Sequence, residues 1–262
     1  MSAEHFFIVG AQRSGTTHLC HLLASHPDIE MATPFRPEPK FFLLDDLFAN
    51  GLSYYEQAFF GRKPEARLRG EKTVSYMESD KAARRIADCF PEGRIVFLLR
   101  DPIERAISHY WFSVENGVET LEMEEAFRRE EGENGERWHR LSMSPFSYLR
   151  RGCYVRDIVR YEGLFGRERL HILLYEDLVR GRVAFGGLCR WLGVSDRVRP
   201  EAPARDLNLR ANQGGAVPAP VWPRLAEHFA EPTAELGARY GLDLGVWTEH
   251  WADATPNGFS AD

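Results

Sequence analysis

Three nearly continuous apolar runs divide this chain and indicate buried strands. They are Phe6–Val9, Arg94–Leu99 and Leu170–Leu174. A strand that is covered on both faces is apolar along its length, because neither face contacts water. Segments with helical periodicity lie between the runs, so the pattern predicts an α/β protein. We expect a three-layer sandwich in which helices flank a central, mostly parallel sheet on both faces.

Helices are predicted where periodic segments meet capping or breaking residues. The segments are HLCHLLASH after the first strand, Asp80–Phe90, 102–112, Tyr154–Phe165 and Phe185–Leu192. The helix at 102–112 has Asp101 as its N-cap and Pro102 at its first position, and both residue types are favoured there. A terminal helical region, Val221–Tyr240, is predicted to be split by Pro232, because proline removes a helical hydrogen bond.

The segment from Glu115 to Arg140 differs in composition, with nine glutamates and four arginines. One interpretation is a solvated helix at about 121–130 followed by a surface loop. The other is a mobile flap over a substrate site, and both stay open at this point. The chain contains no repeat or low-complexity tract, so the sequence predicts one domain over residues 1–262.

Composition and charge narrow the class of protein. Hydrophobic residues make up 44% of the 262 positions and charged residues 27%, as in soluble globular proteins. The net charge of −6 argues against a nucleic-acid partner, and the first apolar run is too short for a signal peptide or a membrane span. The four cysteines are Cys20, Cys89, Cys153 and Cys189. They form no CxxC pair, which predicts free thiols in the cytoplasm and no metal site.

The loop after the first strand has the features of a phosphate site. Phe6–Val9 is followed by GAQRSGTT and then by a predicted helix, whose first N–H groups are unpaired and whose dipole is positive at that end. Gly10 and Gly15 have the spacing of a Walker loop, but Thr16 stands where that loop has its lysine. That lysine reaches the β- and γ-phosphates of a nucleoside triphosphate. The loop therefore predicts a P-loop-like fold that binds a nucleotide with a different terminal group.

A second phosphate site is predicted after the strand Arg94–Leu99. Arg100 follows this strand directly, and Ser108 lies about two turns into the next helix. Ligands of open α/β sheets bind outside the carboxyl ends of the strands, where a guanidinium group and a hydroxyl suit a phosphate. The alternative is that Arg100 pairs with Asp101 or Glu104, and it stays open. Two phosphate sites indicate a nucleotide with phosphates at both ends of its ribose.

With these motifs the chain resembles the sulfotransferase family that uses 3′-phosphoadenosine 5′-phosphosulfate (PAPS). QRSGTTHL is similar to the 5′-phosphosulfate loop of that family, and RIVFLLRDPIERAISHY to its 3′-phosphate motif. PEPKFF (37–42), GEKTVSYM (70–77) and LHILLYEDL (170–178) extend the resemblance over most of the chain. The first two are most similar to the carbohydrate branch, such as heparan sulfate sulfotransferases, and to its bacterial relatives.

The resemblance implies a cofactor role for the residues that match the two phosphate motifs. The residues expected to bind PAPS, or its product 3′,5′-phosphoadenosine (PAP), are Arg13, Ser14, Gly15, Thr16, Thr17, Arg100 and Ser108. Arg13 would lie near the bridging oxygen of the phosphosulfate, where a cation stabilises the departing phosphate. Arg205 and Arg210 belong to the segment that replaces the basic lid of the Golgi enzymes, and their closing over the 3′-phosphate stays open.

The resemblance also implies catalytic residues. Glu38 falls at the position of the catalytic base of the carbohydrate enzymes, which removes the proton of the acceptor hydroxyl. Lys72 would neutralise the sulfuryl group or the leaving phosphate, together with Arg13, and the alternative that it pairs with Glu71 stays open. His109 remains an alternative base, and Tyr76 is either an acceptor contact or a core residue. Lys40 departs from the pattern, because the carbohydrate enzymes often have histidine there.

The implied activity is metal-independent transfer of a sulfuryl group to a hydroxyl group by in-line displacement. We expect a small-molecule, carrier-bound or carbohydrate acceptor. One alternative is a P-loop kinase or nucleotide hydrolase with a degenerate Walker loop. Another is a binding module that retains the nucleotide site without catalysis.

Overall fold

The computed structural model describes most of the chain, in two compact units. The described residues are 4–132, 144–180, 182–198 and 215–253. The first unit comprises Met1–Arg100 with Asp157–Asn208, and the second comprises Asp101–Arg156 with Leu209–Asp262. The expectation of one domain over residues 1–262 stays a prediction.

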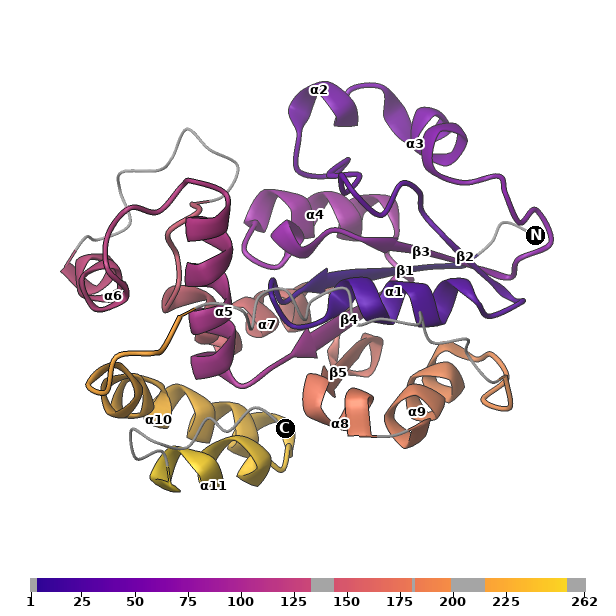
Figure 1. Cartoon of the computed structure of the whole chain (residues 1–262). Helices are drawn as coiled ribbons and strands as arrows, with labels where there is room; N and C mark the ends of the chain where they lie inside the picture. The colour runs from indigo at the N-terminus through magenta and orange to yellow at the C-terminus, as the bar shows by residue number, and fades with distance from the viewer. Residues whose placement is uncertain (1–3, 133–143, 181, 199–214, 254–262) are drawn as a thin grey trace. The chain divides into compact units, whose positions relative to one another are not determined.

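A five-stranded sheet forms the centre of the first unit (Figure 1). Its strands are β1 (Glu4–Gly10), β2 (Ile29–Met31), β3 (Leu68–Lys72), β4 (Arg94–Leu99) and β5 (Leu170–Leu174). The strand order is β2-β3-β1-β4-β5, and every neighbouring pair is parallel. The three predicted strands are confirmed, whereas β2 and β3 were not predicted, because β2 is short and β3 is mostly polar.

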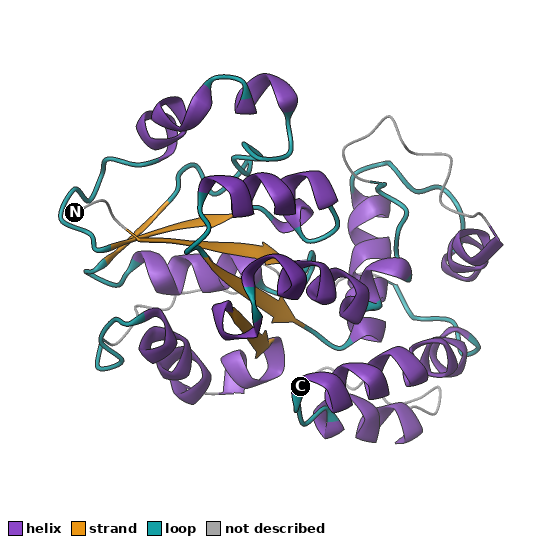
Figure 2. Ribbon diagram, turned by 180° about the vertical axis from the view of Figure 1, so that it is seen from behind, coloured by secondary structure: helices purple, strands orange, loops and turns teal. Residues whose placement is uncertain are grey.

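Helices cover both faces of this sheet (Figure 2). On one face, α1 (Thr16–Ala24), α8 (Tyr175–Arg180) and α9 (Arg182–Leu192) contribute to a buried apolar cluster with residues of β1 and β4. On the other face, Phe7 packs against Phe42 and Phe90, and Phe97 packs against Tyr161. The helices of that layer are α2 (Asp45–Phe48), α3 (Gly51–Phe59), α4 (Asp80–Cys89) and α7 (Tyr154–Phe165). The predicted three-layer α/β sandwich is therefore confirmed.

The second unit is helical where the structure describes it. Its helices are α5 (Pro102–Glu115), α6 (Met123–Gly132), α10 (Val221–Tyr240) and α11 (Gly245–Asp253). The Asp101 carboxylate accepts hydrogen bonds from the Ile103 and Glu104 N–H groups, which confirms its predicted capping role. The predicted split of the terminal helix is wrong, because Pro232 lies inside a continuous α10. Phe229 and Leu236 are buried on either side of it, and this packing holds the helix together despite the missing hydrogen bond.

The acidic segment is partly internal. Helix α6 buries Met123 and Phe127 in the core of the second unit, in agreement with a helix at this place. Glu119 is also buried and accepts hydrogen bonds from the backbone N–H of Thr120 and from the Tyr148 hydroxyl. Buried side chains thus hold this segment in place, and its acidic composition did not indicate which of them would be buried. The flap interpretation falls largely on 133–143, outside the described residues.

The packing of β3 yields a stability prediction. Gly70 lies on β3, and a Cβ atom at this position would overlap the Phe6 ring and the Met31 sulfur. Overpacking of this kind typically costs about 1–3 kcal/mol, so we expect Gly70→Ala to lower the free energy of unfolding by that amount in a denaturant titration. Gly163→Ala is the matched control, because among the described residues no other part of the chain lies within 4 Å of its added methyl group in α7. The control should gain about 0.5–1 kcal/mol. Equal stability of both variants would contradict tight packing at Gly70.

Candidate active site at the carboxyl ends of the strands

Parallel pairing brings three predicted site segments of the first unit to one edge of the sheet. Strand β1 lies between β3 and β4, with Ile8 opposite Lys72 and Gly10 opposite Phe97. All three strands end at the same edge because they run in the same direction. The loop after β1, Lys72 at the end of β3 and Arg100 after β4 therefore leave the sheet together. This is the edge at which open α/β sheets bind ligands.

The loop after β1 turns its backbone N–H groups into a concave arrangement. Arg13 and Gly15 both have left-handed backbone conformations, with φ of 68° and 80°. Such residues within a turn point successive N–H groups to one side, where an anion is favourable. Helix α1 then begins at Thr16, and no side chain caps it at Gly15. The N-cap residue thus leaves the first N–H groups of the helix without a side-chain cap of its own, as in helix termini that bind phosphate.

Ser14 provides the test of whether this loop fits an anionic ligand. Its side chain is fully buried, and its hydroxyl has no hydrogen-bond partner among the described residues. An unpaired buried hydroxyl typically costs about 1–3 kcal/mol. Thr16 and Thr17 are also buried beside it, and Arg36 donates a hydrogen bond of 3.4 Å to the Thr17 hydroxyl. The loop therefore offers a hydroxyl that a phosphate oxygen would satisfy.

Tyr175 was not predicted as a site residue, yet its ring contacts both the loop after β1 and Arg100 in the first unit. A Cβ atom at Gly15 would lie 2.6 Å from Cδ2 of Tyr175, so the loop and the ring are in tight contact. The Arg100 guanidinium lies over the same ring, 5.2 Å from its centroid. Such cation–π contacts hold a guanidinium in place. The available signal was an aromatic residue directly after the carboxyl end of the strand Leu170–Leu174.

Glu38 and Lys72 form a largely buried ion pair at this edge. Lys72 Nζ lies 2.7 Å from Glu38 Oε1, and the side chains are only 4% and 16% exposed. The backbone N–H of Val74 donates to the second Glu38 oxygen at 3.1 Å, and Lys72 also donates to the Phe35 carbonyl at 3.3 Å. Both Glu38 oxygens therefore have a partner, and the carboxylate is held in one orientation. The structure places these two predicted catalytic residues together.

A second buried carboxylate, Glu71, faces the other side of β3. The Tyr55 hydroxyl donates to one of its oxygens at 2.8 Å and the Thr73 hydroxyl to the other at 2.7 Å. Burial raises the pKa of Glu71 to about 7, although these hydroxyl groups and that of Tyr76 oppose the shift. Tyr76 is itself fully buried among aromatic rings, and its hydroxyl accepts the Phe42 N–H. Tyr76 is thus a core residue.

The remaining predicted residues lie in the second unit or outside the described residues. Ser108 and His109 are buried on α5. The His109 Nε2 atom lies 3.2 Å from a guanidinium nitrogen of Arg151, which is a donor, so this ring nitrogen is an acceptor. Arg205 and Arg210 lie in the segment 199–214, outside the described residues.

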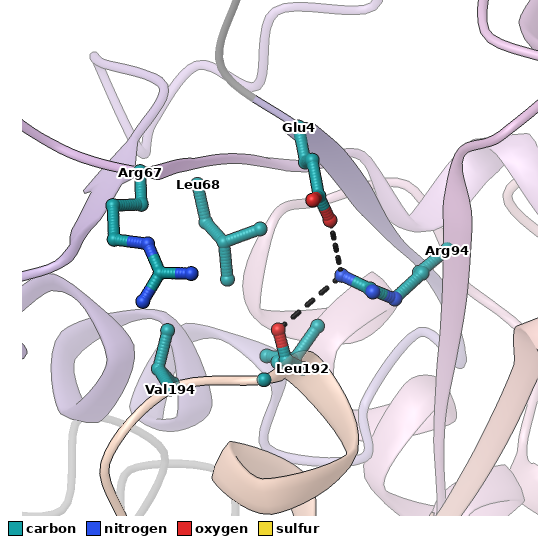
Figure 3. Close-up of a pocket in the computed structure, with 7 residues that line it drawn as sticks. Glu4, Arg67, Leu68, Arg94, Leu192 and Val194 are labelled. Atoms are coloured by element: carbon teal, nitrogen blue, oxygen red, sulfur yellow. Dashed lines mark hydrogen bonds and ion pairs between the residues drawn. The ribbon is translucent and has the colours of Figure 1, made fainter. Parts of the chain in front are cut away.

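A cavity of about 170 Å³ lies at the opposite edge of the sheet (Figure 3). Its wall contains Glu4, Leu68 and Arg94, where β1, β3 and β4 begin, together with residues that follow α9. Arg94 donates hydrogen bonds to the Glu4 carboxylate at 2.8 Å and to the Leu192 carbonyl at 3.2 Å. These polar groups satisfy one another, and the cavity contains none of the predicted site residues.

Two further observations concern cofactors and membranes. The described residues contain no group of three His, Cys, Asp or Glu side chains arranged to hold a metal ion. None of the helices in the described ranges is long and apolar enough to cross a membrane. All four cysteines are free thiols.

Comparison with known proteins gives a consistent family assignment. A family model described as the sulfotransferase family matches residues 5–52 and 37–197. A crystal structure of a sulfotransferase from Alicyclobacillus acidocaldarius superposes with a TM-score of 0.78 and 27% identity, covering 94% of this chain and 99% of that one.

Two curated relatives match over shorter stretches. The membrane-associated sulfotransferase kil1 of Dictyostelium discoideum is 30% identical over 113 residues, which is 42% of this chain and 23% of that protein. Heparan sulfate glucosamine 3-O-sulfotransferase 6 of Mus musculus is 35% identical over 103 residues, which is 39% of this chain and 28% of that protein. The matched stretch spans about a quarter of the length of these relatives.

The raised pKa of Glu71 predicts a pH-dependent stability. The folded-state pKa of about 7 lies above the ordinary value of 4.5, so the protonated form is favoured by folding. This contribution is complete below pH 4.5 and is lost as the pH rises through 7. We expect wild type to lose about 3 kcal/mol relative to Glu71→Gln between about pH 4.5 and 8, measured by denaturant titration.

Glu56→Gln is the control for this measurement. Burial raises the pKa of Glu56, but the hydrogen bonds and charges of His5 and Arg69 outweigh it and bring the pKa below its usual range. The wild type should therefore gain stability relative to Glu56→Gln as the pH rises from acid values. A difference between wild type and Glu71→Gln that did not change with pH would show that Glu71 titrates near its ordinary value.

Proposed function

The chain belongs to the sulfotransferase family, and we propose that it transfers a sulfuryl group from PAPS to a hydroxyl group. The observation that carries this proposal is the 2.7 Å ion pair between Glu38 and Lys72, at the sheet edge from which the Arg13–Thr17 loop also leaves. A held carboxylate, a buried cation and an anion-binding loop are the groups that such a transfer needs.

The residues of the loop and of the 3′-phosphate motif would hold the donor. When bound, PAPS supplies the sulfuryl group and a PAP leaving group. Arg13, Ser14, Gly15, Thr16 and Thr17 would hold the 5′-phosphosulfate, with the unpaired Ser14 hydroxyl in support of this role. Arg100 and Ser108 would hold the 3′-phosphate, and the Tyr175 ring supports the Arg100 guanidinium.

Glu38 acts as the base in the proposed mechanism. It takes the proton from the acceptor hydroxyl as that oxygen forms a bond to sulfur, in line with the sulfur–oxygen bond that breaks. The electron pair of the broken bond stays on the 5′-phosphate, where Lys72 and Arg13 supply positive charge. His109 suits the base role less well, because Arg151 occupies its Nε2 lone pair.

The acceptor is proposed only as a chemical class. The mouse relative is named for heparan sulfate glucosamine, but it matches only 39% of this chain. We therefore propose a small-molecule, carrier-bound or carbohydrate hydroxyl. The four free cysteines favour action in the cytoplasm, where thiols stay reduced.

A kinase or nucleotide hydrolase is the alternative function. It would require a group that neutralises the γ-phosphate, and Thr16 occupies the position of the Walker lysine. A thermal-shift panel separates the two functions. The sulfotransferase predicts stabilisation by PAP without magnesium, whereas the alternative predicts stabilisation by ATP only with magnesium.

Ser14→Ala tests the donor site. Since the hydroxyl is buried and unpaired, its removal should leave the stability of the unliganded protein equal or higher. Calorimetry should show PAP affinity about ten- to a hundredfold lower, the range of one hydrogen bond to a charged group. Ser79→Ala is the matched control, because the Ser79 hydroxyl caps α4 through the Ala82 N–H. It should lose about 1 kcal/mol of stability without a change in PAP affinity. Unchanged PAP affinity in Ser14→Ala would contradict the loop assignment.

Glu38→Gln tests the base. It should lower the transfer of labelled sulfate from PAPS to an acceptor panel by about a hundredfold or more, since the amide cannot take the proton. PAP affinity should persist, because the loop is unaltered. The exposed Glu65 provides a control in the same unit, and Glu65→Gln should retain both properties. Full transfer activity in Glu38→Gln would exclude Glu38 as the base.

A further inference from the structure

Glu71 is a buried carboxylate for which the proposed mechanism has no direct use. It is 1% exposed and lies at the end of β3, next to Lys72 in sequence. Successive side chains of a strand point to opposite faces, so Glu71 and Lys72 lie on opposite sides of the sheet. Desolvation of a carboxylate is costly, and such groups are retained where their hydrogen bonds organise their surroundings.

Its hydrogen bonds lead to the segment that follows Glu38. The Thr73 hydroxyl donates to Glu71 Oε1 at 2.7 Å and accepts the Lys40 N–H at 3.3 Å. The Tyr76 hydroxyl accepts the Phe42 N–H at 3.1 Å, and it lowers the pKa of Glu71. A continuous path therefore runs from the Lys40 N–H through the Thr73 hydroxyl to the carboxylate.

The polarity of this path depends on the carboxylate. Above about pH 7, where Glu71 is ionised, it only accepts hydrogen bonds, so the hydroxyl proton of Thr73 points to Glu71. A lone pair of this hydroxyl is then directed to the Lys40 N–H. A side-chain amide at position 71 can present a donor to the Thr73 hydroxyl and so remove this polarity.

The segment held in this way adjoins Glu38 directly. Only Pro39 separates Glu38 from Lys40, and its ring fixes one backbone angle between them. The Glu38 carboxylate is held at Lys72 and Val74, which flank Thr73. The stretch Lys72–Val74 thus binds Glu38 through its side chain and Lys40 through its backbone N–H.

We propose that Glu71 is a positioning residue, which holds the Lys40 backbone through Thr73 and so keeps Glu38 against Lys72. This inference rests on the proposed function only for its catalytic consequence. The structural part, that Glu71 immobilises the backbone after Glu38, stands independently. A misplacement of about 1 Å at a reacting group lowers rates by as much as a hundredfold, so the effect on turnover should be large.

Amide hydrogen exchange measures the structural part. In Glu71→Gln the Lys40 amide should exchange about tenfold faster or more than in wild type. Thr73→Val removes the hydroxyl and should accelerate Lys40 as well, whereas Thr73→Ser keeps the hydroxyl and should retain protection. Unchanged exchange at Lys40 in Glu71→Gln would overturn the proposal.

Glu30→Gln controls for general loss of stability. Glu30 is a buried carboxylate on β2 that accepts the N–H groups of Gly61, Arg62 and Lys63 at 2.6–3.1 Å. Its replacement should accelerate exchange at those amides and leave Lys40 protected. Acceleration at Lys40 in Glu30→Gln equal to that in Glu71→Gln would show a general effect and would also overturn the proposal.

Turnover measures the catalytic consequence. With labelled PAPS and the acceptor panel, Glu71→Gln should lower kcat about ten- to a hundredfold while KM for PAPS and PAP affinity stay unchanged. Thr73→Ser should retain most of the wild-type kcat. Accelerated exchange with an unchanged kcat would overturn the positioning role. A wild type that binds no PAP would instead refute the proposed function, and the exchange results would still decide whether Glu71 holds the segment.

Discussion

The parallel pairing of β1 with β3 and β4 is the constraint on which the proposed site depends. Residues far apart in sequence become neighbours only because three strands of the same direction end at one edge. This register places three groups at the same edge of the sheet, namely the Arg13–Thr17 loop, Lys72 and Arg100. Tyr175 follows the end of the next parallel strand, β5, and contacts Gly15 and Arg100 at the same edge. The edge where the strands begin shows a different chemistry, since Arg94 is satisfied there by Glu4 and Leu192.

Strand β3 differs from the other buried strands because it contains two buried charged residues. It is buried on both faces, yet it carries Glu71 and Lys72. Each charge is accommodated by specific partners, Lys72 by Glu38 and Glu71 by hydroxyl groups. Burial without such partners would be strongly destabilising. The two networks meet in the stretch Thr73–Tyr76, which links the stability of this unit to the placement of the proposed base.

The sequence predicted those parts of the fold that the apolar pattern dominates. The strands at 94–99 and 170–174 and the helix at 154–165 have the predicted bounds. Strand β3 escaped prediction because its polar residues are buried by tertiary partners, which periodicity does not register. The continuity of α10 through Pro232 was not predicted for a related reason, because tertiary packing outweighed the tendency of proline to interrupt a helix.

For the site, sequence motifs indicated the residues expected to bind or react, but not the residues that hold them in place. The resemblance indicated Glu38 and Lys72 as site residues, and the structure adds that they form an ion pair. The roles of Tyr175 and Glu71 depend on contacts between segments that no local pattern encodes. Residues inside a motif are identifiable from sequence, whereas the residues that hold them require the fold.

A crystal structure of the protein with PAP tests the central claim most directly. The account predicts the 5′-phosphate within hydrogen-bond distance of the Ser14 hydroxyl and the loop N–H groups, with Glu38 still paired to Lys72. PAP bound elsewhere, with the Arg13–Thr17 loop free of phosphate, would contradict it.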